Sequence, residues 1–272
     1  MNELPESSQP SEENEISAQA VSLTRPRRLR RSVFVLPSLF TVANLLCGYY
    51  AILSAMNGMY RNAAIAIAIA IVLDSMDGFI ARLTNTASEF GLQLDSLADI
   101  ISFGVAPSIL VLVWGFSGVD TRLSCAVAFT FTICGAMRLA RFNIQSGHRN
   151  HFVGLPIPAA GGTIAAIVYF FDTPISDSFY ASCMVVVTFI LAFLMVSTVR
   201  YNSLKGITLG RKSHLAVLVI AIFFVLIFLL SRPTLLTLAV AYTLSGPVFK
   251  VFGLLRRKKM EDDTVGPDNI GV

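Results

Sequence analysis

The longest uninterrupted apolar stretch of the sequence runs from Leu215 to Leu230. A backbone that crosses a lipid bilayer must satisfy its own hydrogen bonds, so a stretch of this kind is expected to form a helix. The rest of the chain has the same character, because 54% of its residues are hydrophobic and only 14% are charged. This balance excludes an ordinary soluble domain. The sequence therefore predicts an all-α, polytopic bundle of membrane helices.

A membrane-spanning helix needs about 20 mostly apolar residues. About eight segments of the chain meet this requirement, at 34–57, 62–82, 95–116, 123–141, 155–171, 179–199, 214–230 and 234–254. In the second segment, Ala63, Ala66 and Ala70 fall on one helical face. Small side chains on one face let a neighbouring helix approach closely, so this face is predicted to be a helix contact.

The basic residues predict the orientation, because lysine and arginine accumulate on the cytoplasmic side of membrane helices. If both termini are cytoplasmic, all of the 21 basic residues except Arg61, Arg122 and Arg232 lie on that side. We therefore expect a multi-pass protein of the cell membrane, the inner membrane in a bacterium, with both termini in the cytoplasm. The net charge of +4 is explained by this topology and by anionic lipid headgroups, so no nucleic-acid partner is expected.

Two polar tails flank the apolar part of the chain. Residues 1–32 begin acid-rich and end in a basic, membrane-proximal run, and they are expected to be a disordered cytoplasmic tail. Residues 33–255 are predicted to form one transmembrane domain, and residues 256–272 a cytoplasmic C-terminal tail.

Four aspartates interrupt the apolar pattern where the second predicted span ends and the third begins. A carboxylate near the centre of a membrane helix costs about 2.5–3.5 kcal/mol, so each one needs a reason. Asp74 and Asp77 are three residues apart, and Asp95 and Asp99 are four apart, so each pair projects from one helical face. Two packed helices would bring all four carboxylates to one centre at the cytoplasmic end.

Four carboxylates cannot lie so close together without cations. Oxygen ligands select hard ions, so Mg²⁺ or Mn²⁺ is expected here, as a pair about 3.5–4 Å apart. Such a site suits phosphoryl-type transfer. Gly78 would let a ligand approach the helix backbone beside these carboxylates, and Arg82 would pair with a phosphate or anchor the helix end.

These residues also form a known motif. The chain matches D-x2-D-G-x2-A-R-x8-G-x3-D-x3-D at every fixed position, with Asp74, Asp77, Gly78, Ala81, Arg82, Gly91, Asp95 and Asp99. In this respect it resembles the CDP-alcohol phosphotransferases. The resemblance implies that the four aspartates bind two divalent ions and that Asp95 and Asp99 are catalytic, Asp99 being the base for the acceptor hydroxyl. It also implies that Gly78, Ala81, Arg82 and Gly91 line the site for the CDP-lipid.

From about Leu36 to Lys205 the chain is more specifically similar to the membrane-embedded phosphatidylserine synthases. The similarity lies in Leu36 to Thr41 with Asn44 and Gly48, Met137 to Asn143, Gly154 to Ala160, and Met195 to Ser197 with Arg200 and Tyr201. One departure is Ser38, where these proteins usually have asparagine. The resemblance implies transfer of a phosphatidyl group from CDP-diacylglycerol to L-serine, with phosphatidylserine and CMP as products. It also implies that the protein works among membrane lipids and forms a homodimer.

Several assignments have two readings. Arg138 and Arg141, with Asn143 beside them, are predicted to bind the acceptor or a phosphate, but the arginines are equally well explained as cytoplasmic anchors. Asn44 would contact the CDP-lipid or bond to a neighbouring helix. Within the same family, glycerol phosphate or inositol phosphate is an alternative acceptor. An ion-coupled transporter is a further alternative, because such proteins also place aspartates within the membrane.

Overall fold

The computed structural model describes residues 28–84, 89–145, 152–201 and 232–264. Nearly all of these residues are helical, as predicted. The helices are α2 (Arg28–Met56), α3 (Tyr60–Thr84), α4 (Glu89–Asp99), the π-helix η1 (Ile100–Val105), α5 (Ala106–Gly115), α6 (Thr121–Gln145), α7 (Ile157–Phe171), α8 (Ser178–Val196) and α10 (Arg232–Thr264). Strand β1 (Phe152–Val153) pairs antiparallel with β2 (Arg200–Tyr201), which adds one short ladder beside the helices.

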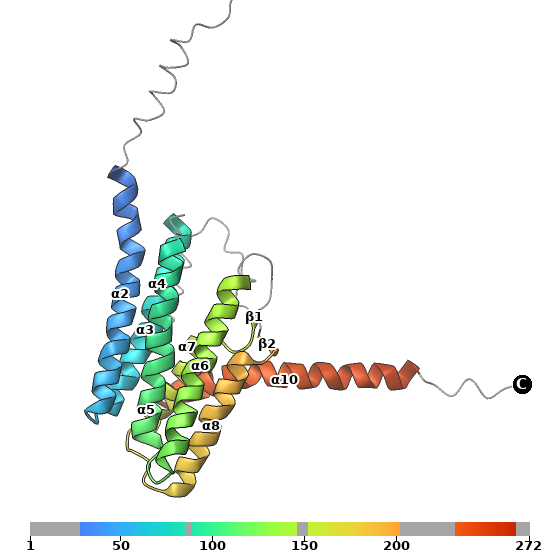
Figure 1. Ribbon diagram of the computed structural model, residues 1–272. Coiled ribbons are helices and arrows are strands. Elements are labelled where there is room, and N and C mark those ends of the chain that lie inside the picture. The colour runs from blue at the N-terminus through green and yellow to red at the C-terminus, as the bar shows by residue number, and fades with distance from the viewer. Residues whose placement is uncertain (1–27, 85–88, 146–151, 202–231, 265–272) are drawn as a thin grey trace, which may run out of the picture.

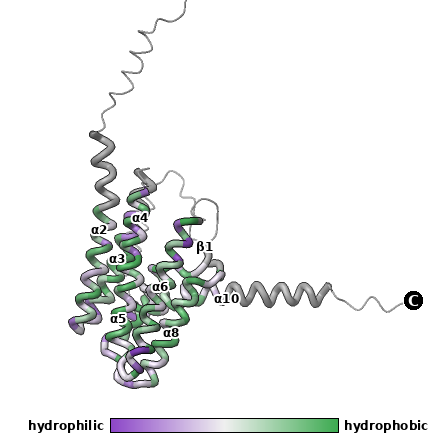
Figure 2. The backbone as a smooth tube through the Cα atoms, viewed as in Figure 1, coloured by the Kyte–Doolittle hydropathy of each residue, from purple (hydrophilic) through white to green (hydrophobic). Residues whose placement is uncertain are grey.

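Four helical stretches of the described chain are long and apolar enough to cross a membrane. They are Leu39–Met56, Glu89–Gly115, Thr121–Ile144 and Ser178–Val196. Helix α7 is apolar but shorter, with 15 residues. Apolar residues follow these helices along most of their length (Figure 2). The protein is therefore a membrane protein, while the predicted span 214–230 lies outside the described residues.

The helices at both ends of the described chain extend into the predicted tails. Helix α2 begins at Arg28, before the expected boundary at residue 33, and α10 continues to Thr264, past residue 255. The end of α10 contains a run of arginine, lysine, methionine and glutamate. These residues favour helix, so the backbone has no local reason to change conformation where the apolar sequence ends.

Local signals explain where other helices begin. The Asp120 carboxylate accepts hydrogen bonds from the backbone amides of Arg122 and Leu123, at 2.9 and 3.1 Å, and so caps α6. Asp177 caps α8 in the same way, by accepting from the Phe179 amide at 2.8 Å. Helix α7 follows Pro156 and has proline in its first turn, where the missing amide hydrogen costs nothing.

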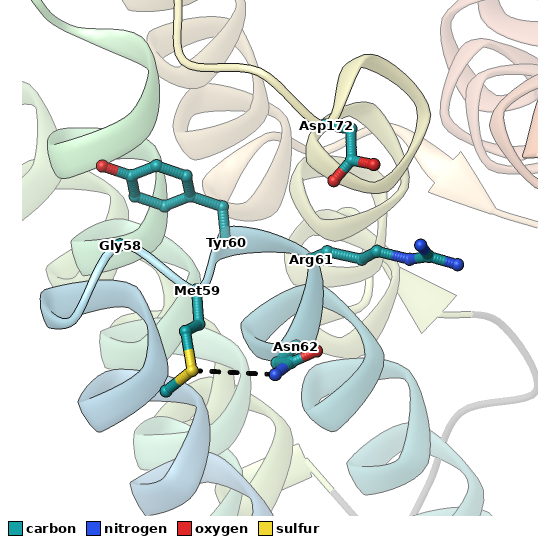
Figure 3. A pocket seen from close by; sticks show the side chains of 6 residues that line it. All are labelled: Gly58, Met59, Tyr60, Arg61, Asn62 and Asp172. Atoms are coloured by element: carbon teal, nitrogen blue, oxygen red, sulfur yellow. Dashed lines mark hydrogen bonds between the residues drawn. The ribbon is translucent and has the colours of Figure 1, made fainter.

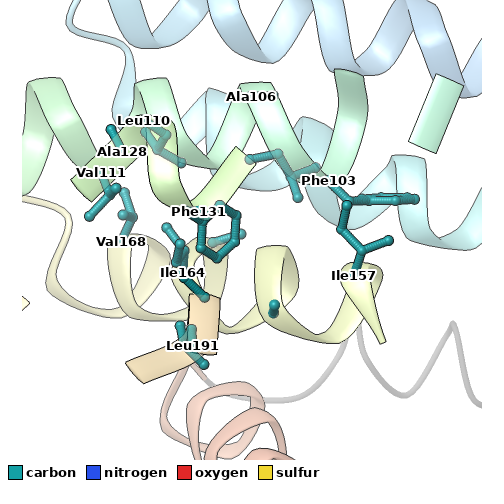
Figure 4. Close-up of a cluster of buried hydrophobic side chains, with 14 of the residues drawn as sticks. Phe103, Ala106, Leu110, Val111, Ala128, Phe131, Ile157, Ile164, Val168 and Leu191 are labelled. Carbon is teal, nitrogen blue, oxygen red and sulfur yellow. The ribbon is translucent and has the colours of Figure 1, made fainter. Parts of the chain in front are cut away.

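The core lies between η1, α5, α6, α7 and α8. Its large side chains include Phe103, Leu110, Phe131, Ile157 and Ile164, none of which has exposed surface (Figure 4). The predicted small-residue face of α3 is confirmed as a packing surface. Its members Ala63, Ala66 and Ala70 are buried, and α3 packs against α2 and α7.

The long helices α2, α3, α6 and α8 run side by side, together with the continuous α4–η1–α5 helix (Figure 1). Helix α10 packs against α7 and then leaves the bundle at a steep angle. The end of α3 and the start of α4 lie at the same end of the bundle, and the turn between α2 and α3 lies at the other. The chain therefore brings the motif residues of α3 and α4 together near one end.

Candidate active site

Three of the four predicted aspartates form one cluster. Carboxylate oxygens of Asp74, Asp95 and Asp99 all lie within 4.8 Å of one another. Asp74 comes from α3, and the other two come from α4. The carboxyl groups of Asp74 and Asp99 are also within hydrogen-bonding reach of each other. The spacing of the motif thus produces a compact group of oxygen ligands shared by α3 and α4, both of which pack against α2.

Asp77 lies outside this group, although it belongs to the same turn of α3 as Asp74. Its Oδ2 atom accepts a hydrogen bond from the Thr41 hydroxyl of α2 at 2.5 Å. Both side chains are buried, with exposures of 6% for Asp77 and 4% for Thr41. Asp77 still interacts electrostatically with Asp74 and Asp95, so it borders the cluster. The motif contains no signal for Thr41, which precedes Asp77 by 36 residues.

A π-helix begins directly after Asp99. Segment η1 covers Ile100–Val105 and separates α4 from α5 within one continuous helix. A π-turn contains an extra residue and therefore changes the direction in which the residues before it face, and such turns are frequent at functional sites. If α4 and α5 were joined by α-helix instead of η1, Asp95 and Asp99 would therefore face another direction.

The cluster fits divalent cations. The Asp95 Oδ1 and Asn44 Oδ1 atoms are buried and have no hydrogen-bond partner among the described residues. Buried polar atoms without a partner are rare and call for a ligand or ion. Carboxylate and amide oxygens are ligands that Mg²⁺ and Mn²⁺ accept. Asp74, Asp95 and Asp99 are therefore suited to hold such an ion.

Arg138 of α6 supplies positive charge beside the cluster. Its guanidinium interacts electrostatically with Asp99 and Asp74, and it lies 5.4 Å from the centre of the Phe142 ring. It also interacts with Tyr242 of α10. Sequence reasoning missed Tyr242, because it lies in an ordinary apolar segment far from the motif. A hydrogen bond of 3.0 Å between the Thr163 and Thr243 hydroxyls joins α7 to α10 next to this tyrosine.

The other predicted site residues are distributed around the cluster. Asn44 donates from Nδ2 to Asp99 Oδ1 at 3.5 Å, so it faces the site. Asn143 donates to the Ser96 hydroxyl oxygen at 2.9 Å and thereby joins α6 to α4. Gly78 and Gly91 are partly buried in α3 and α4, as is Arg141 in α6. Ala81 and Arg82 belong to α3, but their side chains lie outside the described ones.

A separate cavity of about 250 Å³ lies at the turn between α2 and α3 and is lined by Gly58 to Asn62 and by Asp172 (Figure 3). Asp172 forms an ion pair of 3.3 Å with Arg232 at the start of α10. Arg61 and Arg232 both lie within 6 Å of the Tyr169 ring centre, at 5.7 and 5.5 Å. Arg61 precedes Asp74 by thirteen residues of α3, which is about 20 Å at about 1.5 Å per residue. This cavity is therefore distinct from the aspartate cluster.

The comparison with known proteins agrees with this geometry. A family model described as CDP-alcohol phosphatidyltransferase matches residues 34–194, which include all four motif aspartates. The chain belongs to the CDP-alcohol phosphatidyltransferase family. The matched region ends before α10, so the helix that carries Tyr242 lies beyond it.

Individual relatives give a narrower picture. The CDP-diacylglycerol–serine O-phosphatidyltransferase of Helicobacter pylori is 36% identical over 195 residues, which cover 69% of this chain and 80% of the relative. The protein of the same name from Bacillus subtilis is 34% identical over 170 residues, covering 62% and 91%. The archaetidylserine synthase of Methanothermobacter thermautotrophicus is 36% identical over 178 residues, covering 64% and 72%.

Proposed function

We propose that this protein transfers the phosphatidyl group of CDP-diacylglycerol to L-serine, so that phosphatidylserine and CMP are formed. The observation that carries the proposal is the cluster of Asp74, Asp95 and Asp99, which brings three of the motif's four aspartates together. Serine as the acceptor is supported by the names of the relatives, since the bacterial proteins and the archaeal one share a serine acceptor by name.

The aspartates have separate roles in this scheme. Asp74, Asp95 and Asp99 hold the divalent cations, and Asp77 borders them while it accepts the hydrogen bond of Thr41. Divalent cations, when bound, neutralise the diphosphate of the lipid substrate and stabilise the charge that develops on the departing CMP. The resemblance implies two ions. Titration of the protein with Mg²⁺ and with Mn²⁺ tests which metal it binds.

The transfer itself is a single displacement. The serine hydroxyl oxygen attacks the lipid-side phosphorus, a new P–O bond forms, and the bond from that phosphorus to CMP breaks. Asp99 accepts the hydroxyl proton, and CMP leaves with the bonding electron pair. Arg138, beside Asp99 and Asp74, is placed to bind an anionic group of either substrate. Gly78 and Asn44, with the motif residues Ala81, Arg82 and Gly91, contact the CDP-lipid.

The membrane arrangement is part of the proposal. Seven of the eight predicted spans coincide with helices, and four helical stretches of the described chain are long and apolar enough to cross a membrane. The count of eight spans and the cytoplasmic position of both termini are proposed from the distribution of the basic residues. The aspartate cluster would then face the cytoplasm, where CDP-lipid and serine are both available. The 33–255 transmembrane domain, the two cytoplasmic tails, the location in the cell membrane and a homodimer remain predictions. Accessibility labelling of single cysteines tests the topology, and light scattering in detergent tests the dimer.

The experiment uses purified protein with CDP-diacylglycerol, Mn²⁺ or Mg²⁺ and labelled serine, followed by identification of the lipid product. We expect labelled phosphatidylserine and an equal amount of CMP. Glycerol phosphate and inositol phosphate are supplied in parallel, and a lipid formed only from one of them would contradict serine as the acceptor. CMP release that requires no acceptor would contradict the direct displacement.

Matched variants locate the reaction. Asp95→Asn and Asp99→Asn keep the shape of the side chain and remove the charge, so both should reduce CMP release to background. Asp120→Asn makes the same change at the exposed cap of α6, where asparagine caps equally well, and should retain activity. Full activity of Asp99→Asn would contradict the assignment of the base.

A further inference from the structure

Helix α2 and the π-helix η1 meet in a fully buried contact next to the aspartate cluster. The Ser102 hydroxyl of η1 donates a hydrogen bond to the backbone carbonyl oxygen of Asn44 in α2 at 3.0 Å. Neither Asn44 nor Ser102 has any exposed surface. This hydrogen bond is additional to the backbone hydrogen bonds within α2. It therefore joins the backbone of α2 to a side chain of η1.

Gly48 allows this contact to be as close as it is. A Cβ atom at Gly48 would lie 2.7 Å from the Ser102 Cα atom and would also collide with the Ser102 hydroxyl. Real Cβ atoms essentially never approach other atoms so closely, and the obstacle is backbone that cannot rotate away. The position one turn after Asn44 therefore requires a residue without a side chain.

Asn44 connects the contact to the catalytic carboxylates. Its amide Nδ2 donates to Asp99 Oδ1 at 3.5 Å, and Asp99 is the last residue of α4 before η1. Asp99 lies close to Asp74 and Asp95, whose negative charges repel it. A donor on the side of α2 counters this repulsion and keeps the Asp99 carboxylate in the cluster.

The π-turn makes the contact necessary. Each residue of an α-helix turns the chain by about 100°, so one residue more or less in η1 would rotate Asp95 and Asp99 away from α3. A π-turn is less stable than an α-turn and persists where surrounding contacts hold it. Where η1 packs against α2, Ser102 bonds to Asn44 and lies against Gly48, and η1 also packs against α6 and α7.

We propose that Asn44, Gly48 and Ser102 form a clasp that holds the π-turn and thereby fixes the orientation of Asp99 within the cation site. Ser102 is a positioning residue in this account, because it acts on Asp99 through Asn44. The inference rests on the proposed role of Asp99. It assigns part of the site geometry to α2 and η1, which carry none of the motif aspartates.

The test compares Ser102→Ala with Ser108→Ala in the full chain. Ser108 lies in the same continuous helix and is also buried. Its hydroxyl donates to the carbonyl oxygen of Val105, the last residue of η1, at 2.8 Å and accepts from the Thr132 hydroxyl of α6 at 3.0 Å, so neither bond reaches α2 or Asp99. Both variants lose one buried hydroxyl, and only the first loses the link to Asp99. The readouts are the Mn²⁺ concentration for half-maximal thermal stabilisation of the purified protein, and kcat with KM for serine.

Groups that orient metal ligands typically change metal affinity or activity by about 10- to 100-fold when they are removed. Ser102→Ala should therefore raise the half-saturating Mn²⁺ concentration by about tenfold or more and lower kcat, whereas Ser108→Ala should leave both near the wild-type values. Equal Mn²⁺ concentrations for the two variants would overturn the proposal. If Ser102→Ala does not fold, Ser102→Cys, which keeps one heavy atom beyond Cβ but donates only weakly, is judged by the same two outcomes.

The Mn²⁺ readout does not depend on the acceptor. A wild-type protein that binds Mn²⁺ but makes no phosphatidylserine would contradict the proposed function and would still allow the clasp to be tested. A protein that makes phosphatidylserine, with Ser102→Ala indistinguishable from Ser108→Ala, would overturn the clasp and leave the function intact.

Discussion

Replacing Gly78 with alanine should separate the stability of the protein from its activity. A Cβ atom at Gly78 meets no atom of the described residues within 4 Å, so none of these residues requires the glycine for helix packing. Glycine inside a helix is less favourable than alanine by about 1 kcal/mol. The free energy of unfolding of Gly78→Ala should therefore be equal to that of the wild type or up to about 1 kcal/mol higher.

Activity should change in the opposite direction. Gly78 directly follows Asp77 in α3, and in the proposed site the open space beside it receives the CDP-lipid. A methyl group in an otherwise filled site costs about 1–3 kcal/mol. Since 1.4 kcal/mol corresponds to about a tenfold change, kcat/KM for CDP-diacylglycerol should fall by about 5- to 150-fold.

The assay measures initial rates of CMP release in detergent micelles at varied CDP-diacylglycerol and saturating serine. Unfolding by titration with sodium dodecyl sulfate, followed by circular dichroism, reports stability on the same preparation. A normally folded Gly78→Ala protein with unchanged kcat/KM would refute the assignment of this space to the lipid substrate. A loss of both activity and stability would refute the view that the glycine is dispensable for packing.

Two further pairs of variants test the packing around the site. Gly161→Ala should destabilise the protein by about 1–3 kcal/mol, because its Cβ would lie 2.8 Å from the Phe103 carbonyl oxygen. In Gly162→Ala the new Cβ meets only the end of a flexible side chain at 2.9 Å, so this variant should be as stable as the wild type. Equal losses of unfolding free energy in denaturant titration would contradict this difference. Thr41→Val removes the donor to Asp77 and should cost about 1–3 kcal/mol of unfolding free energy, while Thr41→Ser keeps the hydroxyl and should retain most of it. A Thr41→Val protein as stable as Thr41→Ser would show that the bond to Asp77 is not needed.

The helices were accessible from the sequence because the bilayer leaves few alternatives. Long apolar stretches must be helical there, and this reasoning located α2, α3, α6 and α8 to within a few residues at most ends. It failed at the outer ends of α2 and α10, where the apolar signal stops but the helix does not. Hydrophobicity reports where lipid contacts end, and helix propensity decides where the backbone changes.

The candidate site was accessible only in part. Fixed spacing within two adjacent helices predicted the proximity of Asp74, Asp95 and Asp99. The separate position of Asp77 depends on Thr41, a residue of another helix, and spacing within α3 carries no information about that partner. The π-turn after Asp99 escaped detection for a similar reason, since one extra residue in a continuous apolar helix hardly changes the hydrophobic pattern.

The partner of Asn143 could not be predicted from the sequence either. Its place beside Arg138 and Arg141 favours a role in binding the acceptor or a phosphate, and in the structure its amide bonds to Ser96 of α4. A side-chain amide can serve helix packing and a ligand equally well by composition. Only the position of its neighbours distinguishes the two, and those neighbours come from a helix far away in the sequence.

The central claim is that Asp74, Asp95 and Asp99 jointly hold divalent cations. Electron paramagnetic resonance of purified protein titrated with Mn²⁺ measures this directly, without any substrate. The account predicts saturable binding in the wild type and in Asp120→Asn, and its loss in Asp95→Asn and Asp99→Asn. Wild-type Mn²⁺ binding in both of the latter variants would contradict it.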